Sequence, residues 1–148
     1  MNTRAHIHEE VFTATPEDVF SLLYTPSAIR QWWEATRVIT MPQPDGFWCA
    51  AWGDSEDEPD YTSSATIEVF EPPRRLVLVD YKYVARTGGL PFDADFTVEF
   101  LITPVSDGAS LRVTQDGFPA GKEGDAFLDS CDVGWRETFK GIRRFLSQ

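Results

Sequence analysis

Hydrophobic and polar residues alternate with a period of two along most of this chain, which predicts β-strands. The clearest case runs from Asp95 to Thr103, where the apolar alternate positions hold Phe, Val, Phe and Ile. Shorter runs of the same kind predict further strands at 5–12, 36–41, 46–52, 65–70, 75–84 and 111–113. Short turns such as Asp107–Gly108 separate several of them, so we expect neighbouring strands to pair antiparallel.

A different period predicts three helices. Two short ones begin at Thr15–Pro16 and Thr25–Pro26, because Thr is a good N-cap and Pro suits the first helical turn. A long helix is predicted from about Asp125 to Phe145, where apolar residues recur at steps of three and four. The glycine-containing segment 117–124 before it is interpreted as a flexible loop that ends the sheet and hinges a lid.

The order of these elements predicts an α+β fold rather than a wound parallel sheet. A curved antiparallel β-sheet of six to seven strands would surround a long C-terminal α-helix, with two short helices after the first strand. The length of 148 residues suits one domain, and we expect residues 1–148 to form it.

The first strand places two kinds of side chain on opposite faces. Ile7 and Val11 share one face, and His6, His8 and Glu10 share the other. Zinc sites use three or four ligands in a closed shell, and no fourth ligand lies nearby in the sequence. We therefore predict no metal site and expect the histidine face to be solvated.

Charge narrows the range of partners. The chain has 13 basic and 24 acidic residues and a net charge of −11, which repels phosphate backbones and anionic lipids. We predict no nucleic-acid partner and no membrane partner. The acidic loop 54–60 lacks the central Gly and the ligand spacing of a calcium-binding loop, so we expect it to be solvated.

The two cysteines, Cys49 and Cys131, are far apart and belong to no recognisable motif. The simplest interpretation is two buried free thiols in a protein of the reducing cytoplasm. The sequence shows neither a nucleophile elbow nor a glycine-rich phosphate loop. We therefore predict no cofactor, and the sequence favours a protein that is not an enzyme.

Large aromatic residues are abundant, with 11 Phe, 5 Trp and 4 Tyr. Such a composition favours a core or a pocket built from large rings. Trp32 and Trp33 are adjacent on a helix and cannot face the same way, so one is expected in the core and the other at a pocket.

Seven blocks along the chain resemble the START-like (SRPBCC, Bet v-like helix-grip) superfamily. Within it they resemble the branch named after a homologue of the ATPase activator of the ninety-kilodalton heat-shock chaperone. The blocks are 15–20 with 25–26, 32–33, 45–48, 69–77, 97–100, 111–119 and 134–135.

The resemblance implies a cavity between the sheet and the C-terminal helix, where members hold lipids, hormones or polyketides. We therefore expect this chain to bind a small apolar or aromatic ligand, lipid- or polyketide-like, without a tightly bound cofactor. The expected lining is Trp33, Phe47, Trp48, Cys49, Tyr81, Phe92, Phe96, Val98, Phe100, Phe118, Phe127, Cys131 and Trp135.

Two other functions stay open at this point. One is an enzyme of the cyclase or aromatase kind, in which Asp80 or a Tyr transfers protons; Asp80 stands where members often carry an aromatic residue. The other is a chaperone-associated interaction module that works through its surface. Gln115 also departs from the family, whose members often have His there. The resemblance leaves both a monomer and a homodimer open.

Overall fold

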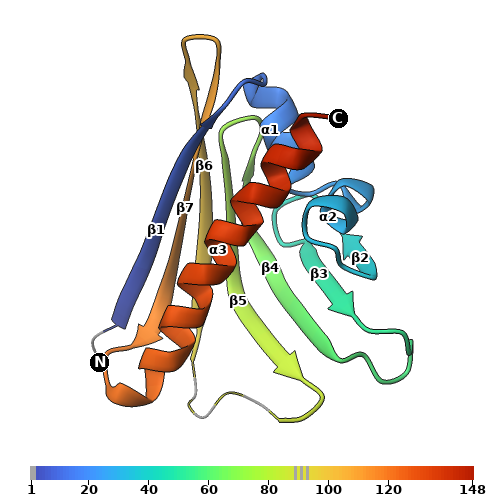
Figure 1. Cartoon of the computed structure of the whole chain (residues 1–148), viewed down its shortest axis with the longest axis vertical. Helices are drawn as coiled ribbons and strands as arrows, with labels where there is room; N and C mark the ends of the chain where they lie inside the picture. Colours follow the sequence, from blue (N-terminus) through green and yellow to red (C-terminus); the bar gives the residue numbers. More distant parts are fainter. Residues whose placement is uncertain (1–2, 89, 91, 93) are drawn as a thin grey trace.

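Seven strands form one antiparallel sheet in the computed structural model, which describes residues 3–88, 90, 92 and 94–148 (Figure 1). The order across the sheet is β1-β7-β6-β5-β4-β3-β2. The strands are β1 (Thr3–Phe12), β2 (Arg37–Thr40), β3 (Phe47–Trp52), β4 (Tyr61–Glu71), β5 (Arg75–Ala85), β6 (Phe96–Val105) and β7 (Gly108–Pro119). The helices are α1 (Pro16–Leu22), α2 (Pro26–Trp32), a 3-10 turn (Lys122–Gly124) and α3 (Asp125–Leu146). The predicted α+β class and element order are confirmed.

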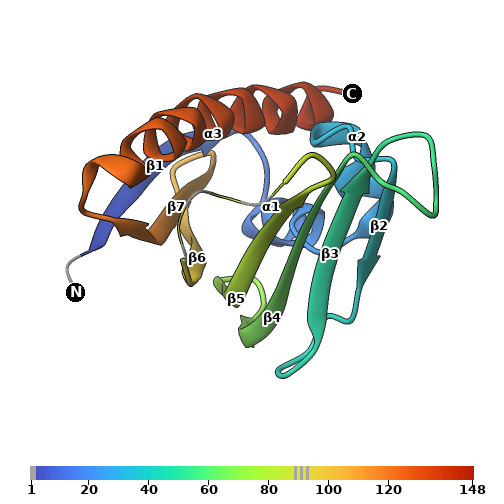
Figure 2. The same cartoon turned by 90° about the horizontal axis from the view of Figure 1, so that it is seen from below.

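The sheet is strongly curved, and the three α-helices lie on its concave side (Figure 2). Helix α1 packs against β6 and β7, while α2 packs against α3 and β2. The buried residues of α3 all lie in its second half, at Thr138, Phe139, Gly141 and Ile142. The first half of α3 is therefore the less tightly packed part.

The short helices begin where the sequence predicts, although their caps differ. The Thr15 hydroxyl accepts a hydrogen bond from the Asp18 amide at 3.1 Å, which is a normal N-cap. Thr25 makes no such bond, and its hydroxyl instead donates to the Ser21 carbonyl at 2.6 Å. The second Thr thus links α2 back to the end of α1.

The segment predicted as a loop from 117 to 124 is largely regular structure. Strand β7 continues to Pro119, which pairs with Thr3 of β1. Gly117 has a φ of 112°, and a Cβ there would lie 2.4 Å from the Asp95 carbonyl oxygen. Glycine at 117 thus permits a close backbone approach inside the sheet, and the predicted loop start was wrong.

A β-bulge in β5 sets the direction of its side chains. Leu78 pairs with Val98 and Tyr81 with Phe96, so β5 has one more residue than β6 in this interval. Asp80 lies in the bulge with a left-handed φ of 51° and an exposed side chain. Simple alternation would group Asp80 with Leu76 and Leu78, but both faces of the strand are partly apolar, so the sequence leaves the orientation of Asp80 open. The bulge instead turns Asp80 outward and Tyr81 inward.

The two faces of β1 are oriented opposite to expectation. Ile7 and Val11 are 65% and 56% exposed, whereas the side chains of His6 and His8 are only 15% and 14% exposed. The polar face packs against α3 because the helix offers it matching polar partners. The expectation of a solvated histidine face was wrong.

Two glycines of α3 provide a matched test of helix packing. A Cβ at Gly141 would lie 2.2 Å from the Trp32 carbonyl oxygen, whereas a Cβ at Gly134 would meet nothing within 4 Å. We expect Gly141→Ala to lower the free energy of unfolding by about 1–3 kcal/mol through overpacking. Gly134→Ala should raise it by up to about 1 kcal/mol through helix propensity. Urea denaturation measures both, and equal effects would contradict this packing.

Candidate functional site

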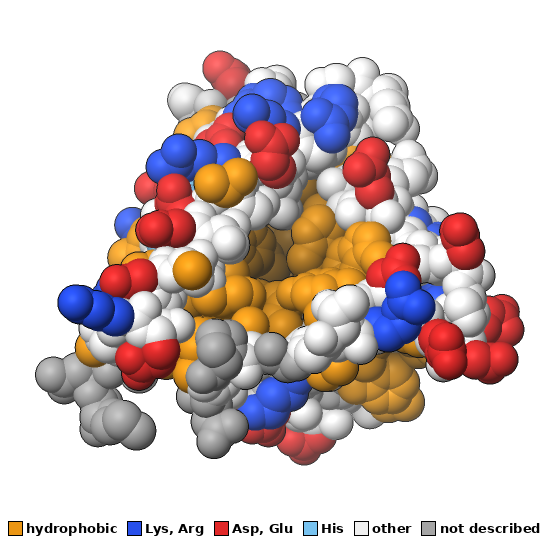
Figure 3. Space-filling model, turned by 60° about the horizontal axis from the view of Figure 1, so that its bottom comes forward, with side chains coloured by type: hydrophobic (Ala, Val, Ile, Leu, Met, Phe, Trp, Pro, Cys, Tyr) orange, Lys and Arg blue, Asp and Glu red, His pale blue; other side chains and the backbone are white. Residues whose placement is uncertain are grey.

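A hollow of about 200 Å³ opens between the first half of α3 and the concave face of the sheet. Figure 3 shows it as a depression lined by hydrophobic side chains, with charged side chains on the surrounding surface. We call it the aromatic cleft. It is lined by Trp33, Tyr61, Tyr83, Gln115, Phe127, Ser130, Cys131, Gly134, Trp135 and Thr138.

Two further depressions adjoin the aromatic cleft near the segment that joins β5 to β6. One, of about 290 Å³, shares Tyr61, Tyr83 and Phe127 with the cleft and extends to Leu90. The other, of about 270 Å³, shares Tyr83 and reaches Phe92. Because Tyr83 lines all three, a guest molecule could extend from one into the next past this ring.

A short chain of hydrogen bonds crosses the floor of the cleft. Trp135 Nε1 donates to Gln115 Oε1 at 2.7 Å, and Gln115 Nε2 donates to the Tyr83 hydroxyl oxygen at 2.9 Å. Gln115 is completely buried. These bonds satisfy the buried amide and fix the orientation of two aromatic side chains from different elements.

One buried polar atom near this floor has no partner. The Ser63 hydroxyl oxygen is inaccessible to solvent and makes no hydrogen bond of normal geometry within the described part of the chain, although it lies near the Tyr61 and Tyr81 hydroxyls. Ser63 alternates with Tyr61 along β4, so the two share the concave face. An unpaired buried hydroxyl is costly, and a small movement towards either tyrosine hydroxyl would relieve the cost.

The ionisable groups lining the cleft are held in their neutral forms. Burial raises the pKa of Tyr61 and of Tyr83 above the usual tyrosine range. Burial likewise raises the pKa of the Cys131 thiol to about 12. At neutral pH these groups are therefore protonated, and the cleft is uncharged where they line it.

Of the residues expected to line a site, seven border these depressions. Trp33, Phe127, Cys131 and Trp135 line the aromatic cleft itself. The depression towards Phe92 is lined by the other three, Tyr81, Phe92 and Phe96. Trp32 does not line the cleft and is buried, with Nε1 donating to the Leu22 carbonyl at 2.9 Å.

Four others form the packed core beneath the cleft. Trp48, Val98, Phe100 and Phe118 are all at most 3% exposed. Trp48 Nε1 donates to the Leu23 carbonyl at 2.9 Å, which holds β3 against the end of α1. The Phe100 ring contacts Trp135 edge to face, with centroids 6.0 Å apart. These side chains support the lining and do not face the hollow.

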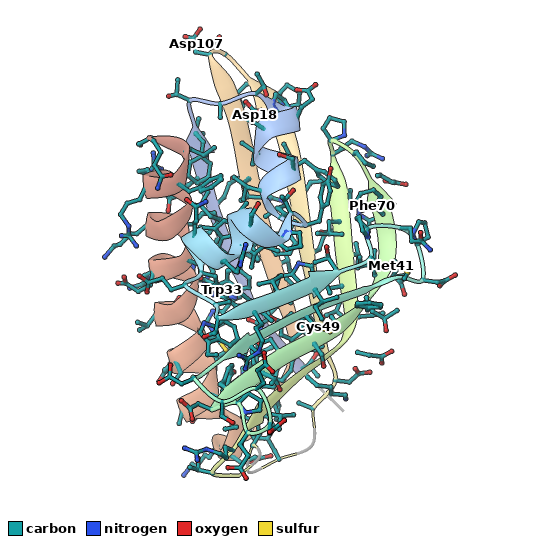
Figure 4. All side chains as sticks on the ribbon, turned by 90° about the vertical axis from the view of Figure 1, so that its right-hand side faces the viewer. Asp18, Trp33, Met41, Cys49, Phe70 and Asp107 are labelled. Carbon is teal, nitrogen blue, oxygen red and sulfur yellow. The ribbon has the colours of Figure 1, made fainter. Side chains whose placement is uncertain are left out.

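Phe47 and Cys49 lie on the other face of the sheet. They alternate with Trp48 and Ala50, which are buried on the concave side. Cys49 instead lines a shallow depression of about 300 Å³ on the convex face. In Figure 4 Trp33 lies close to α3, whereas Cys49 lies farther from the helix among the strands. We leave both residues out of the candidate site.

Sequence reasoning missed Tyr61, Tyr83 and Gln115 as lining residues. Gln115 had a detectable signal, because it follows Leu111 and Val113 at alternate positions of an otherwise apolar face. Tyr83 had none, since simple alternation groups it with Val77 and Val79, and only the bulge at Asp80 turns it inward.

The curved antiparallel sheet that encloses a long C-terminal helix defines a START-like helix-grip protein. The chain belongs to the family described as Activator of Hsp90 ATPase homolog 1-like protein, which matches residues 13–147. No curated protein sequence matches the chain. Among the described residues, no helix has both the length and the hydrophobicity needed to cross a membrane.

Several solved structures share the fold at low sequence identity. Protein MLL2253 from Mesorhizobium loti has a TM-score of 0.79 and 22% identity, with 97% of each chain covered. The HSP90 activator PFC0360w from Plasmodium falciparum has a TM-score of 0.73 and 16% identity, covering 97% of this chain and 96% of that one. DynU16, from the dynemicin biosynthetic locus, has a TM-score of 0.77 and 14% identity, covering 97% of this chain and 47% of that one.

The raised pKa values predict how the protein responds to alkali. The pKa of free tyrosine is about 10. Burial raises the pKa values of Tyr61, Tyr81 and Tyr83 in the fold, so these side chains stay protonated at higher pH. The unfolded chain then loses protons first, so the free energy of unfolding falls as the pH rises above that of free tyrosine. In an absorbance titration, three of the four tyrosines should ionise only as the protein unfolds. Ionisation of all four with an unchanged circular dichroism spectrum would contradict this.

Proposed function

We propose that this protein binds a small apolar or aromatic ligand in the aromatic cleft. The observation that supports the proposal most directly is an open hollow lined by rings, above a fixed chain of hydrogen bonds. Binding sites for small molecules are typically concave and mostly apolar, with a few well-placed polar groups. The cleft combines these features on elements that are themselves anchored in the core.

The dimensions favour an elongated or multi-ring guest. The cleft alone, at about 200 Å³, is smaller than the roughly 300–1,000 Å³ of typical ligand pockets. A ligand of ordinary size would therefore extend past Tyr83 into one of the adjoining depressions. Flat rings suit this path because Tyr83 and Phe127 meet edge to face, with centroids 5.1 Å apart, and offer aromatic faces and edges.

The polar groups favour a ligand that carries a carbonyl or hydroxyl oxygen. Since Tyr83 accepts a hydrogen bond from Gln115, its own hydroxyl hydrogen points elsewhere, where a ligand oxygen would compete with Cys131 and Tyr81 as the acceptor. A lipid- or polyketide-like molecule with an oxygenated end fits this pattern, and DynU16 comes from a biosynthetic locus.

The same groups argue against the cyclase or aromatase alternative. Asp80, its proposed base, is exposed on the convex side of β5. The described residues that line the three depressions include neither a carboxylate nor a histidine. Cys131 and the tyrosines are protonated at neutral pH and cannot accept a proton there. Binding without chemistry is therefore the function that we propose.

A pair of cysteine variants tests the proposal. Cys131→Phe places a ring in the cleft, and Cys49→Phe makes the same change on the convex face. The probe is phenylnaphthylamine, a neutral dye whose fluorescence rises in apolar surroundings. Displacing about 60 Å² of buried apolar dye surface costs about 1.5 kcal/mol, so Cys131→Phe should raise the Kd roughly tenfold.

Cys49→Phe should leave the dye Kd unchanged, and circular dichroism checks that both variants fold. Native mass spectrometry of the protein from its source would identify a ligand that copurifies. Equal dye affinity in both folded variants would overturn the assignment of the site. Tyr83→Ala, which enlarges the cleft, gives a second reading if Cys131→Phe does not fold.

A second candidate function is contact with Hsp90, which the family description and PFC0360w suggest. A separate observation favours it, because Ile39, Met41 and Phe47 are exposed close together at the β2 edge.

If this patch binds the chaperone, the protein should change the ATPase rate of purified Hsp90, and Ile39→Glu should abolish that change. Cys131→Phe is the matched control and should not. An ATPase rate that the protein leaves unchanged would contradict this function.

A further inference from the structure

Three potential metal ligands meet where β1 lies against α3, outside the aromatic cleft. His6 and His8 project from β1, and Asp132 projects from α3. His6 Nδ1 lies 3.8 Å from Asp132 Oδ1, and His8 Nε2 lies 3.4 Å from the same oxygen. All three ligand atoms lie within 4.8 Å of one another, and the three side chains are partly buried.

The backbone of α3 determines which nitrogen of His6 is available. His6 Nε2 lies 2.5 Å from the Leu128 carbonyl oxygen. A carbonyl oxygen can only accept, so Nε2 carries the hydrogen, and in the neutral ring Nδ1 carries the lone pair. That lone pair is on the nitrogen nearest Asp132. Histidine ligands of metals commonly donate their other N–H to a carbonyl in this way.

The other two ligand atoms, His8 Nε2 and Asp132 Oδ1, are also placed where they could bind the same ion. His8 Nε2 is inaccessible to solvent and has no hydrogen-bond partner among the described residues. The second oxygen of Asp132, Oδ2, is held by the Arg136 guanidinium at 2.7 Å, which leaves Oδ1 facing the histidines. Arg136 is largely exposed, so its charge is screened by water. The lone pair of His6 Nδ1, the ring nitrogen His8 Nε2 and a carboxylate oxygen therefore face a common point, and His8 would bind an ion in the tautomer that carries its hydrogen on Nδ1.

We propose that His6 Nδ1, His8 Nε2 and Asp132 Oδ1 form a binding site for a divalent transition-metal ion, with Zn²⁺ as the probe. This replaces the sequence-based prediction of no metal site, which considered only ligands nearby in the sequence and so did not include Asp132. Two imidazoles and one carboxylate are ligands that zinc accepts, and three protein ligands leave a fourth position for water. At zinc–ligand distances of about 2.0–2.1 Å, tetrahedral ligand atoms lie about 3.3 Å apart. The two distances to Asp132 Oδ1, 3.4 and 3.8 Å, are close to this spacing. All three atoms lie within 4.8 Å of one another, so rotation of the imidazoles towards each other would complete the site.

This site is independent of the proposed ligand-binding function. Cys131 and Asp132 are neighbours on α3, but Cys131 lines the cleft and Asp132 faces β1. A bound ion would join the N-terminal edge strand to the C-terminal helix. We therefore expect it to stabilise the fold and to leave dye binding in the cleft unchanged.

Competition with a chromophoric chelator measures zinc binding by the whole protein at neutral pH. We expect one zinc ion to bind per chain. His8→Ala and Asp132→Asn should each raise the Kd for zinc by about tenfold or more. Asp129→Asn makes the same charge change at an exposed position of α3 and should bind like the original protein. Cys131→Ser removes the nearest thiol and should also bind normally, which excludes a cysteine site.

Two further measurements keep the outcome interpretable. Zinc at about a hundred times its Kd should raise the melting temperature by roughly 5–10 °C in the original protein and not in Asp132→Asn. Because the chain has only two histidines, nitrogen NMR of the imidazole rings reports the ligands directly. Zinc should shift both His6 Nδ1 and His8 Nε2. The proposal is overturned if micromolar zinc does not bind, or if it binds equally to the His8→Ala and Asp132→Asn proteins.

Discussion

The way in which α3 is anchored determines the rest of this structure. Its second half is pinned by the close approach of Gly141 to the Trp32 backbone, together with the burial of Phe139 and Ile142. Its first half is tied sideways to β1 through the Arg4–Asp125 ion pair at 2.8 Å and the contact of His6 with Leu128. A helix fixed at one end and along one edge cannot also settle onto β4 and β5, so the hollow beside Cys131 and Trp135 remains.

The floor of that hollow depends on one irregularity in β5. The bulge at Asp80 reverses the alternation, so that Tyr81 and Tyr83 join Leu76 and Leu78 on the concave face. Tyr83 then reaches Gln115, which in turn accepts from Trp135 of α3. An unbroken strand would place a carboxylate in the cleft and both tyrosines outside it. The strained φ of Asp80 therefore determines whether the cleft is charged or neutral.

The two sides of α3 face different chemistry. Towards β4 and β5 it presents Phe127, Cys131 and Trp135 to an apolar space. Towards β1 it presents Asp132 to two imidazoles. Helical geometry turns successive side chains by about 100°, so adjacent residues can serve both sides. One helix would thus support both the proposed ligand-binding function and the proposed metal site, and we expect that each can be altered without removing the other.

Local patterning was enough to predict the order of elements, the helix starts at Pro16 and Pro26 and the long last helix, because periodicity and capping act over a few residues. It also placed Phe127, Cys131 and Trp135 on one stripe of that helix. It left the orientation of Asp80 open and missed Tyr83, because the bulge arises from pairing with β6. It failed for the extension of β7 through Gly117, which depends on the Asp95 backbone. It also predicted that the wrong face of β1 would be solvated.

An isolated strand favours its apolar face as the buried one, but β1 packs against a helix whose nearest groups are the Asp125 side chain, the Leu128 carbonyl oxygen and the Asp132 side chain. Which face is buried depends on what lies opposite, and contacts between residues more than a hundred positions apart exist only in the folded chain.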